Sequence, residues 1–194
     1  MFLSIPTVIT VPAAYSDTIT VNSSSSVTYL SNGTSTTTDF PAPFTAANFT
    51  SARTGVNAAV LSSIPYYTTA PSLTTAGAQW IGTSAGAGNG STPGYTALYA
   101  VSFTIPDPFT VAAFTLNYEV DNELGDLNPG IYLNGIALPL STGIGAAEFS
   151  GLNTYSDSNV AGELVQGTNW LYIDAVNVGY EAGLVAIGAA RRRR

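Results

Sequence analysis

Apolar and polar residues alternate along most of this chain, and this alternation constrains the fold more than any other feature. One face of the segment 98–105, "LYAVSFTI", carries Tyr99, Val101, Phe103 and Ile105. The same pattern recurs in the segments 17–21, 26–30, 114–120, 169–178 and 183–189. Because successive side chains of a strand point to opposite faces of a sheet, a period of two predicts strands with one buried face. The chain is therefore expected to be all-β.

Turn residues separate these segments at short intervals. Asn134-Gly135 is the strongest hairpin signal, since both central positions of a type I′ turn need positive φ. A single stretch, 45–61, has a helical pattern, which Gly55 weakens. Many short strands with such turns predict an antiparallel β-sandwich or jelly roll. We expect an N-terminal β-arm or extra strands in residues 1–45, the sandwich in 46–190 and an arginine tail in 191–194.

Charge is scarce and unevenly placed. Charged residues make up 9 % of the chain, and Arg53 is the sole cation before Arg191–Arg194. Without a basic face to meet phosphates, the body is not expected to bind nucleic acid. The arginine tail is expected either to be solvated or to touch phosphate, an anionic lipid surface or an acidic neighbour. No apolar run reaches the roughly 18 residues of a membrane span, so none is expected.

The acidic stretch "DNELGDLNPGIYLNG" (121–135) is the candidate metal site. Asp121, Glu123 and Asp126 offer carboxylate oxygens, the ligands that Ca²⁺ prefers, although their spacing is not that of an EF-hand. The alternative is a solvated acidic turn leading into the hairpin, and we favour the turn. No other cofactor is expected.

Catalysis has little support in the sequence. The chain contains no His and no Cys, so the commonest general base and thiolate metal ligands are missing. "GTSAG" (82–86) matches the nucleophile-elbow pattern at Ser84, but no His is available to take its proton, and we expect a glycine-rich loop. Glu119 and Asp121 share a strand face, yet a solvated position would not suit a glycosidase pair.

Two tyrosines are candidate ligand or interface residues. Tyr66 and Tyr67 lie in the Pro-flanked segment "IPYYTTAP" (64–71). Exposed rings in such a loop can stack on sugars or on a neighbouring subunit. Glycans are therefore candidate partners.

Four segments, taken in order, resemble one family. They are "AQWIG" (78–82), residues 102–135, "EFSG" (148–151) and residues 164–189. Together they are similar to the galactose-binding-like jelly-roll domain of bacterial exported surface proteins, including exosortase-sorted ones. The resemblance implies a β-sandwich without a catalytic role, often used for carbohydrate recognition and sometimes holding a structural Ca²⁺. Two departures stand out: "GLVAIGAA" is too short for the sorting signal's hydrophobic span, and the N-terminus is a poor signal peptide.

Two functions follow from these features. The first is a non-enzymatic structural subunit of an extracellular or particle-surface assembly, such as a filament or a virion shell. The neutral surface and the arm favour it, because an edge strand can complete a neighbour's sheet. We then expect a homo-oligomer or polymer formed through the N-terminal arm. The alternative is a carbohydrate-binding surface module. The expected location is extracellular or at the cell surface, or else a virion.

Overall fold

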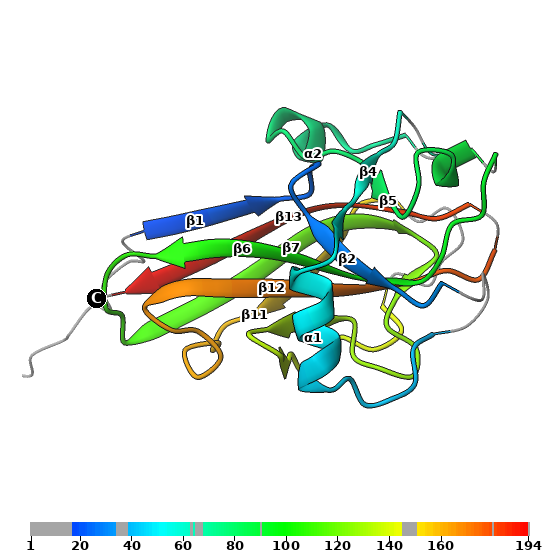
Figure 1. The fold of residues 1–194 in the computed structure, drawn as a ribbon. Coiled ribbons are helices and arrows are strands. Elements are labelled where there is room, and N and C mark those ends of the chain that lie inside the picture. Colours follow the sequence, from blue (N-terminus) through cyan, green and yellow to red (C-terminus); the bar gives the residue numbers. More distant parts are fainter. Residues whose placement is uncertain are drawn as a thin grey trace, which may run out of the picture.

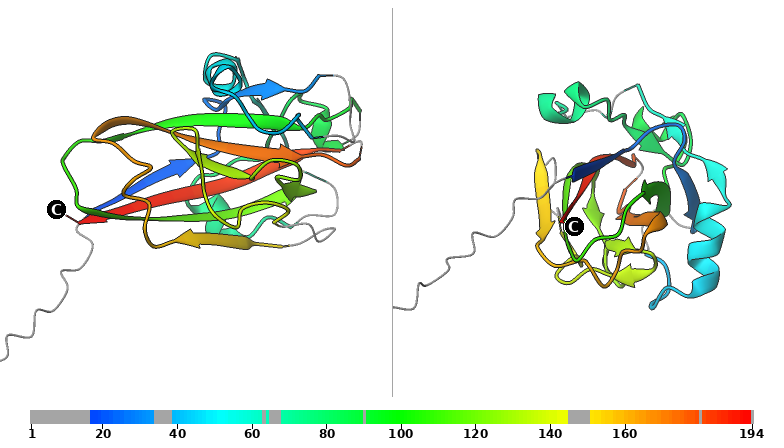
Figure 2. Two further views of the ribbon diagram at one scale, coloured as in Figure 1. Left: turned by 90° about the horizontal axis from the view of Figure 1, so that it is seen from below. Right: turned by 90° about the vertical axis from the view of Figure 1, so that its left-hand side faces the viewer.

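Four long strands form the centre of the structure, and they follow the alternating segments of the sequence. The computed structural model describes residues 17–33, 39–62, 64, 68–89, 91–144, 151–179 and 181–193. The long strands are β6 (Ala97–Ile105), β7 (Val111–Asp121), β12 (Gly167–Val176) and β13 (Gly183–Arg193). β7 pairs with β13 and β12 pairs with β6 (Figure 1). The two pairs lie in different layers (Figure 2).

Shorter strands extend each pair into a sheet. They are β1 (Asp17–Asn22), β2 (Thr28–Ser31), β3 (Val56–Asn57), β4 (Ala59–Val60), β5 (Ile81–Gly82), β8 (Glu123–Leu124), β9 (Ile131–Leu133), β10 (Ile136–Ala137) and β11 (Asn153–Asp157). The six-stranded sheet has the order β11-β7-β13-β5-β4, with β1 also on β13. The seven-stranded sheet has the order β10-β9-β12-β6-β2-β3, with β8 also on β12. The expected all-β antiparallel sandwich is therefore confirmed.

The main core lies between the two sheets. β7 contributes Phe114 and Leu116, and β12 contributes Leu171 and Ile173 from every second position. Burying one such side chain stabilises the fold by roughly 1.5–3 kcal/mol relative to leaving it exposed. The period of two seen in the sequence thus separates the core-facing side chains of the long strands from the outward-facing ones.

The helix α1 (Ala46–Arg53) covers the outer face of the seven-stranded sheet (Figure 1). Its first turn is closed by a capping box, in which the Thr45 hydroxyl and the Asn48 side chain each accept from the other residue's backbone N–H. The expected helical stretch continued to residue 61, but the helix ends at Arg53. A side chain at Gly55 would collide with the Tyr29 carbonyl, and β3 follows directly.

A second helix, α2 (Pro71–Thr75), lies over the outer face of the six-stranded sheet, and a 3₁₀ turn, η1 (Ala87–Asn89), follows β5. Leu73 of α2 is fully buried against Trp80 and Val185. The sequence pattern did not predict α2, because five residues are too few for a helical period to emerge. The Trp80 Nε1–H donates to the Thr69 hydroxyl at 2.7 Å, which satisfies the polar edge of the buried ring.

The first two strands enter different sheets. β1 pairs with β13 in the six-stranded sheet, whereas β2 pairs with β6 in the seven-stranded sheet. Val21 and Val27 are both buried in the main core. The region expected to be an arm or extra strands therefore supplies one strand to each layer. A division of the chain at residue 45 stays a prediction, and residues 1–16 are outside the described residues.

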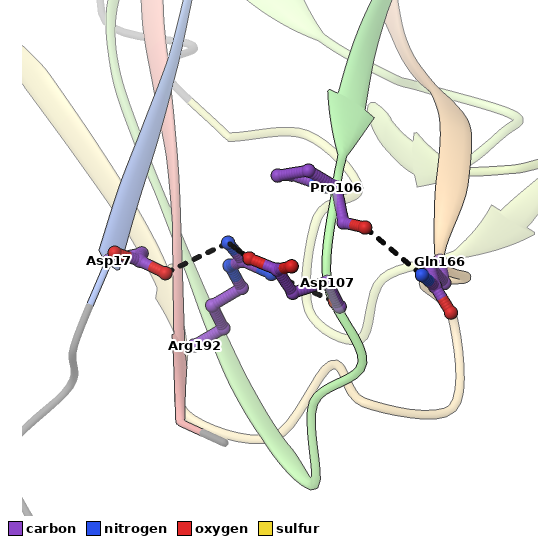
Figure 3. A network of polar contacts seen from close by, with 5 residues as sticks. All are labelled: Asp17, Pro106, Asp107, Gln166 and Arg192. Atoms are coloured by element: carbon purple, nitrogen blue, oxygen red, sulfur yellow. Dashed lines mark hydrogen bonds and ion pairs between the residues drawn. The ribbon is translucent and has the colours of Figure 1, made fainter.

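The arginine run is part of the six-stranded sheet. Arg191 to Arg193 continue β13, and Arg192 is only 4 % exposed. Its guanidinium contacts the Asp17 carboxylate at 2.8 Å and donates to the Asp107 carbonyl at 2.8 Å (Figure 3). Beside it, Gln166 Nε2 donates to the Pro106 carbonyl at 3.0 Å. The expectation of a solvated tail is wrong for Arg192. Strand pairing places its guanidinium against the oxygen atoms of Asp17 and Asp107.

Within the described part of the chain, no helix combines the length and the apolar character needed to cross a membrane.

Candidate functional site

The acidic stretch forms a folded corner at one end of the sandwich. Residues 121–137 contain the end of β7, the strand β8, a loop and the β9–β10 hairpin. Asn134 and Gly135 have φ angles of 53° and 84°, so the predicted tight hairpin turn is confirmed. Gly125, with φ 64°, donates its N–H to the Asp174 carbonyl at 2.9 Å, which fixes the loop against β12. The corner is thus tied to the sheet beneath it.

The three carboxylates of the candidate calcium site differ in environment. Asp126 is exposed, whereas Asp121 and Glu123 are half-buried. Burial, with a contribution from Glu181, raises the pKa of Asp121 to about 6. Burial, together with Asp126 and Asp39, also raises the pKa of Glu123. The expectation of a fully solvated turn is therefore wrong for Asp121 and Glu123, whose charged forms are disfavoured at this corner.

Across the described ranges, no three His, Cys, Asp or Glu side chains are grouped so that they could hold a metal ion. Calcium binding by Asp121, Glu123 and Asp126 stays a prediction.

The expectation of a solvated Glu119 is also wrong. Glu119 lies on β7, two positions before Asp121, and is 1 % exposed. Its Oε1 accepts a hydrogen bond from the Ala70 N–H at 2.8 Å. Burial raises the pKa of Glu119, and the Ala70 hydrogen bond partly opposes that rise. This carboxyl group holds the segment before α2 against the six-stranded sheet.

A surface groove of about 450 Å³ lies beside β11, the last strand of the six-stranded sheet in the described part of the chain. The segment 138–144 forms one wall, and β11 with the turn after it forms the other. The apolar and aromatic lining comes from Tyr118, Pro139, Leu140, Ile144 and Tyr155, and the polar lining from Thr154, Ser156, Asp157 and Ser158. The groove therefore presents ring and aliphatic surface beside hydroxyl and carboxylate groups.

Ser141 fixes the first wall of this groove. It is buried, and its hydroxyl donates to the Leu138 carbonyl at 2.8 Å. The Ser141 carbonyl in turn accepts from the Gly130 N–H at 2.6 Å. These bonds connect the wall to the acidic corner, so the groove borders a well-anchored segment.

Tyr155 joins the two walls. Its ring packs against the main core, and its hydroxyl donates to the Pro139 carbonyl at 2.9 Å. Burial, with Asp157 and Glu163, raises the pKa of the Tyr155 phenol to about 12. The phenol therefore stays neutral at physiological pH. The Asp157 Oδ1 accepts from the Asn159 N–H at 2.9 Å, which orients the carboxylate at the end of the strand.

Leu140 stands at the rim of the groove with 92 % of its surface exposed. Its φ of 56° lies in the left-handed region, which costs a leucine roughly 1–2 kcal/mol. An exposed apolar side chain held in a strained backbone position contributes no burial to stability. Such strain is typical of functional sites.

Sequence reasoning did not find Tyr155 or Leu140. Tyr155 is one of eleven tyrosines, and Leu140 follows Pro139 in a segment without a motif. The nearest signal is the polar segment "NTYSD" (153–157), in which Tyr155 is the single aromatic residue. The groove depends on a contact between segments 138–144 and 153–158, which the sequence pattern does not reveal.

The remaining candidates lie elsewhere. Tyr66 and Tyr67 are outside the described residues, so their role as ligand or interface aromatics stays a prediction. Ser84 lies in a loop, where its hydroxyl shares a hydrogen bond of 2.6 Å with the Thr92 hydroxyl. A loop at this position agrees with the sequence interpretation of "GTSAG".

The comparison with known proteins finds a likeness in structure and none in sequence families. No protein-family model matches the chain. No curated protein matches it either. Among solved structures, the chain is similar to the native structure of a family 35 carbohydrate binding module from Clostridium thermocellum, at 11 % identity and a TM-score of 0.44. The match covers 88 % of this chain and 97 % of the module.

Proposed function

We propose that this protein is a non-catalytic carbohydrate-binding module of an extracellular or cell-surface protein, and that the groove beside β11 receives the glycan. The observation that carries the proposal is the lining of that groove. Tyr155, Leu140 and Ile144 supply apolar surface, and Thr154 and Asp157 lie among its polar groups. A sugar has the complementary character, with C–H faces and hydroxyl edges.

The size and charge of the groove also suit a short glycan. A volume of about 450 Å³ is within the range of roughly 300–1,000 Å³ found for small-ligand sites. Asp157 can accept hydrogen bonds from two neighbouring sugar hydroxyls, since an ionised carboxylate accepts through both oxygens. Leu140 can cover the C–H face of the same ring. The ligand class expected is therefore a neutral or basic sugar.

The family resemblance is consistent with this proposal. The segments at 78–82, 102–135, 148–151 and 164–189 resemble galactose-binding-like domains of exported surface proteins. Membership of that family, with a similarity to its exosortase-sorted members, is part of the proposal. The absence of His, Cys and Lys from the chain supports a role in binding rather than catalysis.

The test is a substitution that removes apolar surface from the groove without destabilising the fold. A screen on a glycan array identifies a ligand, and calorimetry measures its Kd. We expect Leu140→Gly to weaken binding at least tenfold and to leave the Tm unchanged or slightly higher, because glycine accepts a positive φ without strain. Val56→Ala, which trims another exposed side chain on β3, is the matched control and should leave Kd unchanged.

Absence of any glycan ligand for the folded protein would contradict the proposal. A glycan that bound equally well to the wild type and to both Leu140→Gly and Asp157→Asn would place the binding site elsewhere.

A structural subunit is the second candidate function, and one observation favours it. β11 has a single hydrogen-bonded neighbour, β7, within the described sheet, and Asp157 is its sole charged residue. Natural proteins usually protect such edges with lysines, prolines or bulges. Electron microscopy and light scattering of the purified protein separate the two functions, because filaments or shells favour the subunit and a dispersed monomer favours the module.

A further inference from the structure

The strand β11 leaves one edge of the six-stranded sheet open. It pairs with β7 on one side, and it forms the outer margin of that sheet in Figure 2. Among the described residues, no backbone group outside β7 forms a hydrogen bond with the backbone of β11. Alternate residues of a strand direct their N–H and C=O groups to opposite sides, so the outer edge of β11 has unused hydrogen-bonding capacity. A strand from another molecule can be added there.

An exposed apolar residue lies beside this open edge. The Tyr155 hydroxyl donates to the Pro139 carbonyl at 2.9 Å, which holds the segment 138–144 against the middle of β11. Leu140, the next residue, is 92 % exposed and has a left-handed backbone conformation. A molecule that covered Leu140 would remove apolar surface from water and offset the cost of that conformation. The edge of β11 and Leu140 thus form one surface that lacks a partner in the described chain.

The sequence of β11, "NTYSD", is complementary to itself when two copies run antiparallel. A twofold axis through Tyr155 places Thr154 of one copy opposite Ser156 of the other. These two hydroxyl residues lie on the outer face of the sheet, whereas Tyr155 packs on the core side. On the core side, Asn153 of one copy lies opposite Asp157 of the other. Hydroxyl pairs and pairs of a neutral amide with a carboxylate are favourable across strands.

This register also keeps the two carboxylates apart. Each Asp157 faces a neutral Asn153, and the two Asp157 residues are four positions apart along the sheet, which is roughly 13 Å. Their repulsion is weak at this separation, because the Debye length is about 8 Å at physiological ionic strength. An axis at Asp157 would place the two carboxylates directly opposite each other, and any axis away from Tyr155 shortens the overlap of the strands. The sequence of β11 therefore favours one register.

We propose that two copies of this chain associate through β11 into a twofold-symmetric dimer with its axis at Tyr155. The two six-stranded sheets then form one continuous sheet, and the two Leu140 side chains cover each other near the axis. A contact of this kind is isologous and closes on itself, so it gives a dimer and no filament. β11 and β1 lie at opposite edges of the sheet, so this contact is separate from association through the N-terminal arm.

The size of the contact sets its strength. β11 has five residues, so the added strand forms few main-chain hydrogen bonds, and Leu140 is the main apolar contribution. Such a contact belongs among the small interfaces, below roughly 1,200 Å² of buried surface, that are typical of transient complexes. We therefore expect a dimer that dissociates on dilution, with a Kd between about 1 µM and 1 mM.

The dimer and the proposed glycan would occupy the same groove, because Leu140, Tyr155 and Asp157 line it. A glycan bound there should raise the apparent Kd of the dimer, and dimerisation should weaken glycan binding by the same factor, since the two equilibria are linked. This competition rests on the proposed function, whereas the dimer itself does not. The dimer would then be the form in which the glycan groove is closed.

The first experiment is sedimentation velocity on the full chain between about 1 µM and 1 mM, where the monomer should convert to a dimer. Asn153→Asp places a carboxylate opposite Asp157 of the second copy, and should weaken the dimer at least tenfold. The double variant Asn153→Asp with Asp157→Asn moves the carboxylate to the other side of the pair, and should restore the dimer. Both variants lose the Asn153 Nδ2 bond to the Gly151 carbonyl, so the difference between them reports the contact alone.

The second experiment tests the register by cross-linking. The chain has no Cys, and Thr154 and Ser156 are both exposed, so Thr154→Cys and Ser156→Cys each add one reactive thiol. A mixture of the two single variants should form disulfide-linked dimers on oxidation, because these positions lie opposite each other. Neither variant alone should do so, since its two thiols are offset by two positions and lie beyond the reach of a disulfide.

Three results would overturn the proposal: a monomer at every concentration, cross-linking as strong in the separate variants as in their mixture, or growth beyond the dimer into longer species. The proposed function fails on different grounds. A dimeric protein without a glycan ligand would contradict the proposed function alone. A protein that binds a glycan in the groove and stays monomeric at every concentration would contradict the dimer alone.

Discussion

At the scale of single residues, the fold places several carboxyl groups where their charge is poorly tolerated. Alternation along β7 was visible in the sequence, and it correctly put Glu119 and Asp121 on one face. The same pattern could not show that this face is covered, because the covering residue 70 lies 49 positions before Glu119. Burial by distant segments is what makes these groups differ from solvated carboxylates.

Asp121 should therefore make the protein less stable as the pH rises. Its pKa is raised from 3.8 to about 6 in the folded protein. Between these values the unfolded chain loses the proton while the folded chain keeps it, so stability falls with rising pH and the full penalty is present above about pH 6. Because Asp121 is only half-buried, solvent screening limits the effect to about 1 kcal/mol.

We expect Asp121→Asn to raise the Tm at pH 7 by a few degrees and to leave it unchanged at pH 3. Thermal denaturation across that pH range checks the prediction. Glu181→Gln should reproduce a smaller part of the gain, since Glu181 is the secondary cause of the shift. A wild-type protein whose Tm rises steadily from pH 4 to pH 6.5, with the variant following in parallel, would contradict it.

At the scale of elements, the positions of the strands were easier to predict than the pairing between them. The long strands β6, β7 and β12 coincide closely with alternating segments, because each has one face in the core. β13 runs further than expected, through Arg191 to Arg193. A run of arginines gives no period-two signal, and only the pairing with β1 and β7 explains why it is extended and partly buried.

Arg192 should stabilise the junction of β1, β13 and the β6–β7 turn. Its guanidinium bonds Asp17 and Asp107, both of which are partly exposed. Since these acidic partners remain in contact with water, we expect Arg192→Ala to cost about 2 kcal/mol rather than the larger loss of a fully buried pair. Denaturant unfolding measures the difference.

The neighbouring Arg191 is exposed and serves as the matched control. Arg191→Ala should change the free energy of unfolding by less than about 0.5 kcal/mol. Equal losses for Arg191→Ala and Arg192→Ala would show that the arginines act through overall charge and not through the contacts in Figure 3.

At the scale of the whole molecule, the sandwich was predictable and the candidate sites were not. Composition and alternation indicated two neutral sheets and little else. The groove brings segment 138–144 beside 153–158, and backbone hydrogen bonds bring Asp39 beside Leu127 and Asn128. Contacts between positions so far apart in the chain leave no periodic trace. Their residues become candidates only when the fold has placed them together.

Truncation tests which residues of the N-terminal region the sandwich needs for its stability. Removing residues 1–16 should leave the β-sheet circular dichroism and the Tm close to those of the full chain, because β1 begins at Asp17. Removing residues 1–22 should cost at least about 3 kcal/mol, since the buried Val21 and the Asp17 partner of Arg192 are lost as well. Global unfolding after the shorter deletion would refute this division.

The position of β13 between β7 and β1 also bears on how the protein is made. A ribosome synthesises residues 17–22 before residues 187–192. In a nascent chain that ends before β13, the edges of β1 and β7 that pair with β13 therefore have no partner strand. Until β13 emerges, the six-stranded layer cannot close over the other sheet, and the apolar side of β7 stays open to solvent. Biosynthesis therefore passes through an aggregation-prone interval, which favours chaperone binding or a translation rate that keeps this interval short.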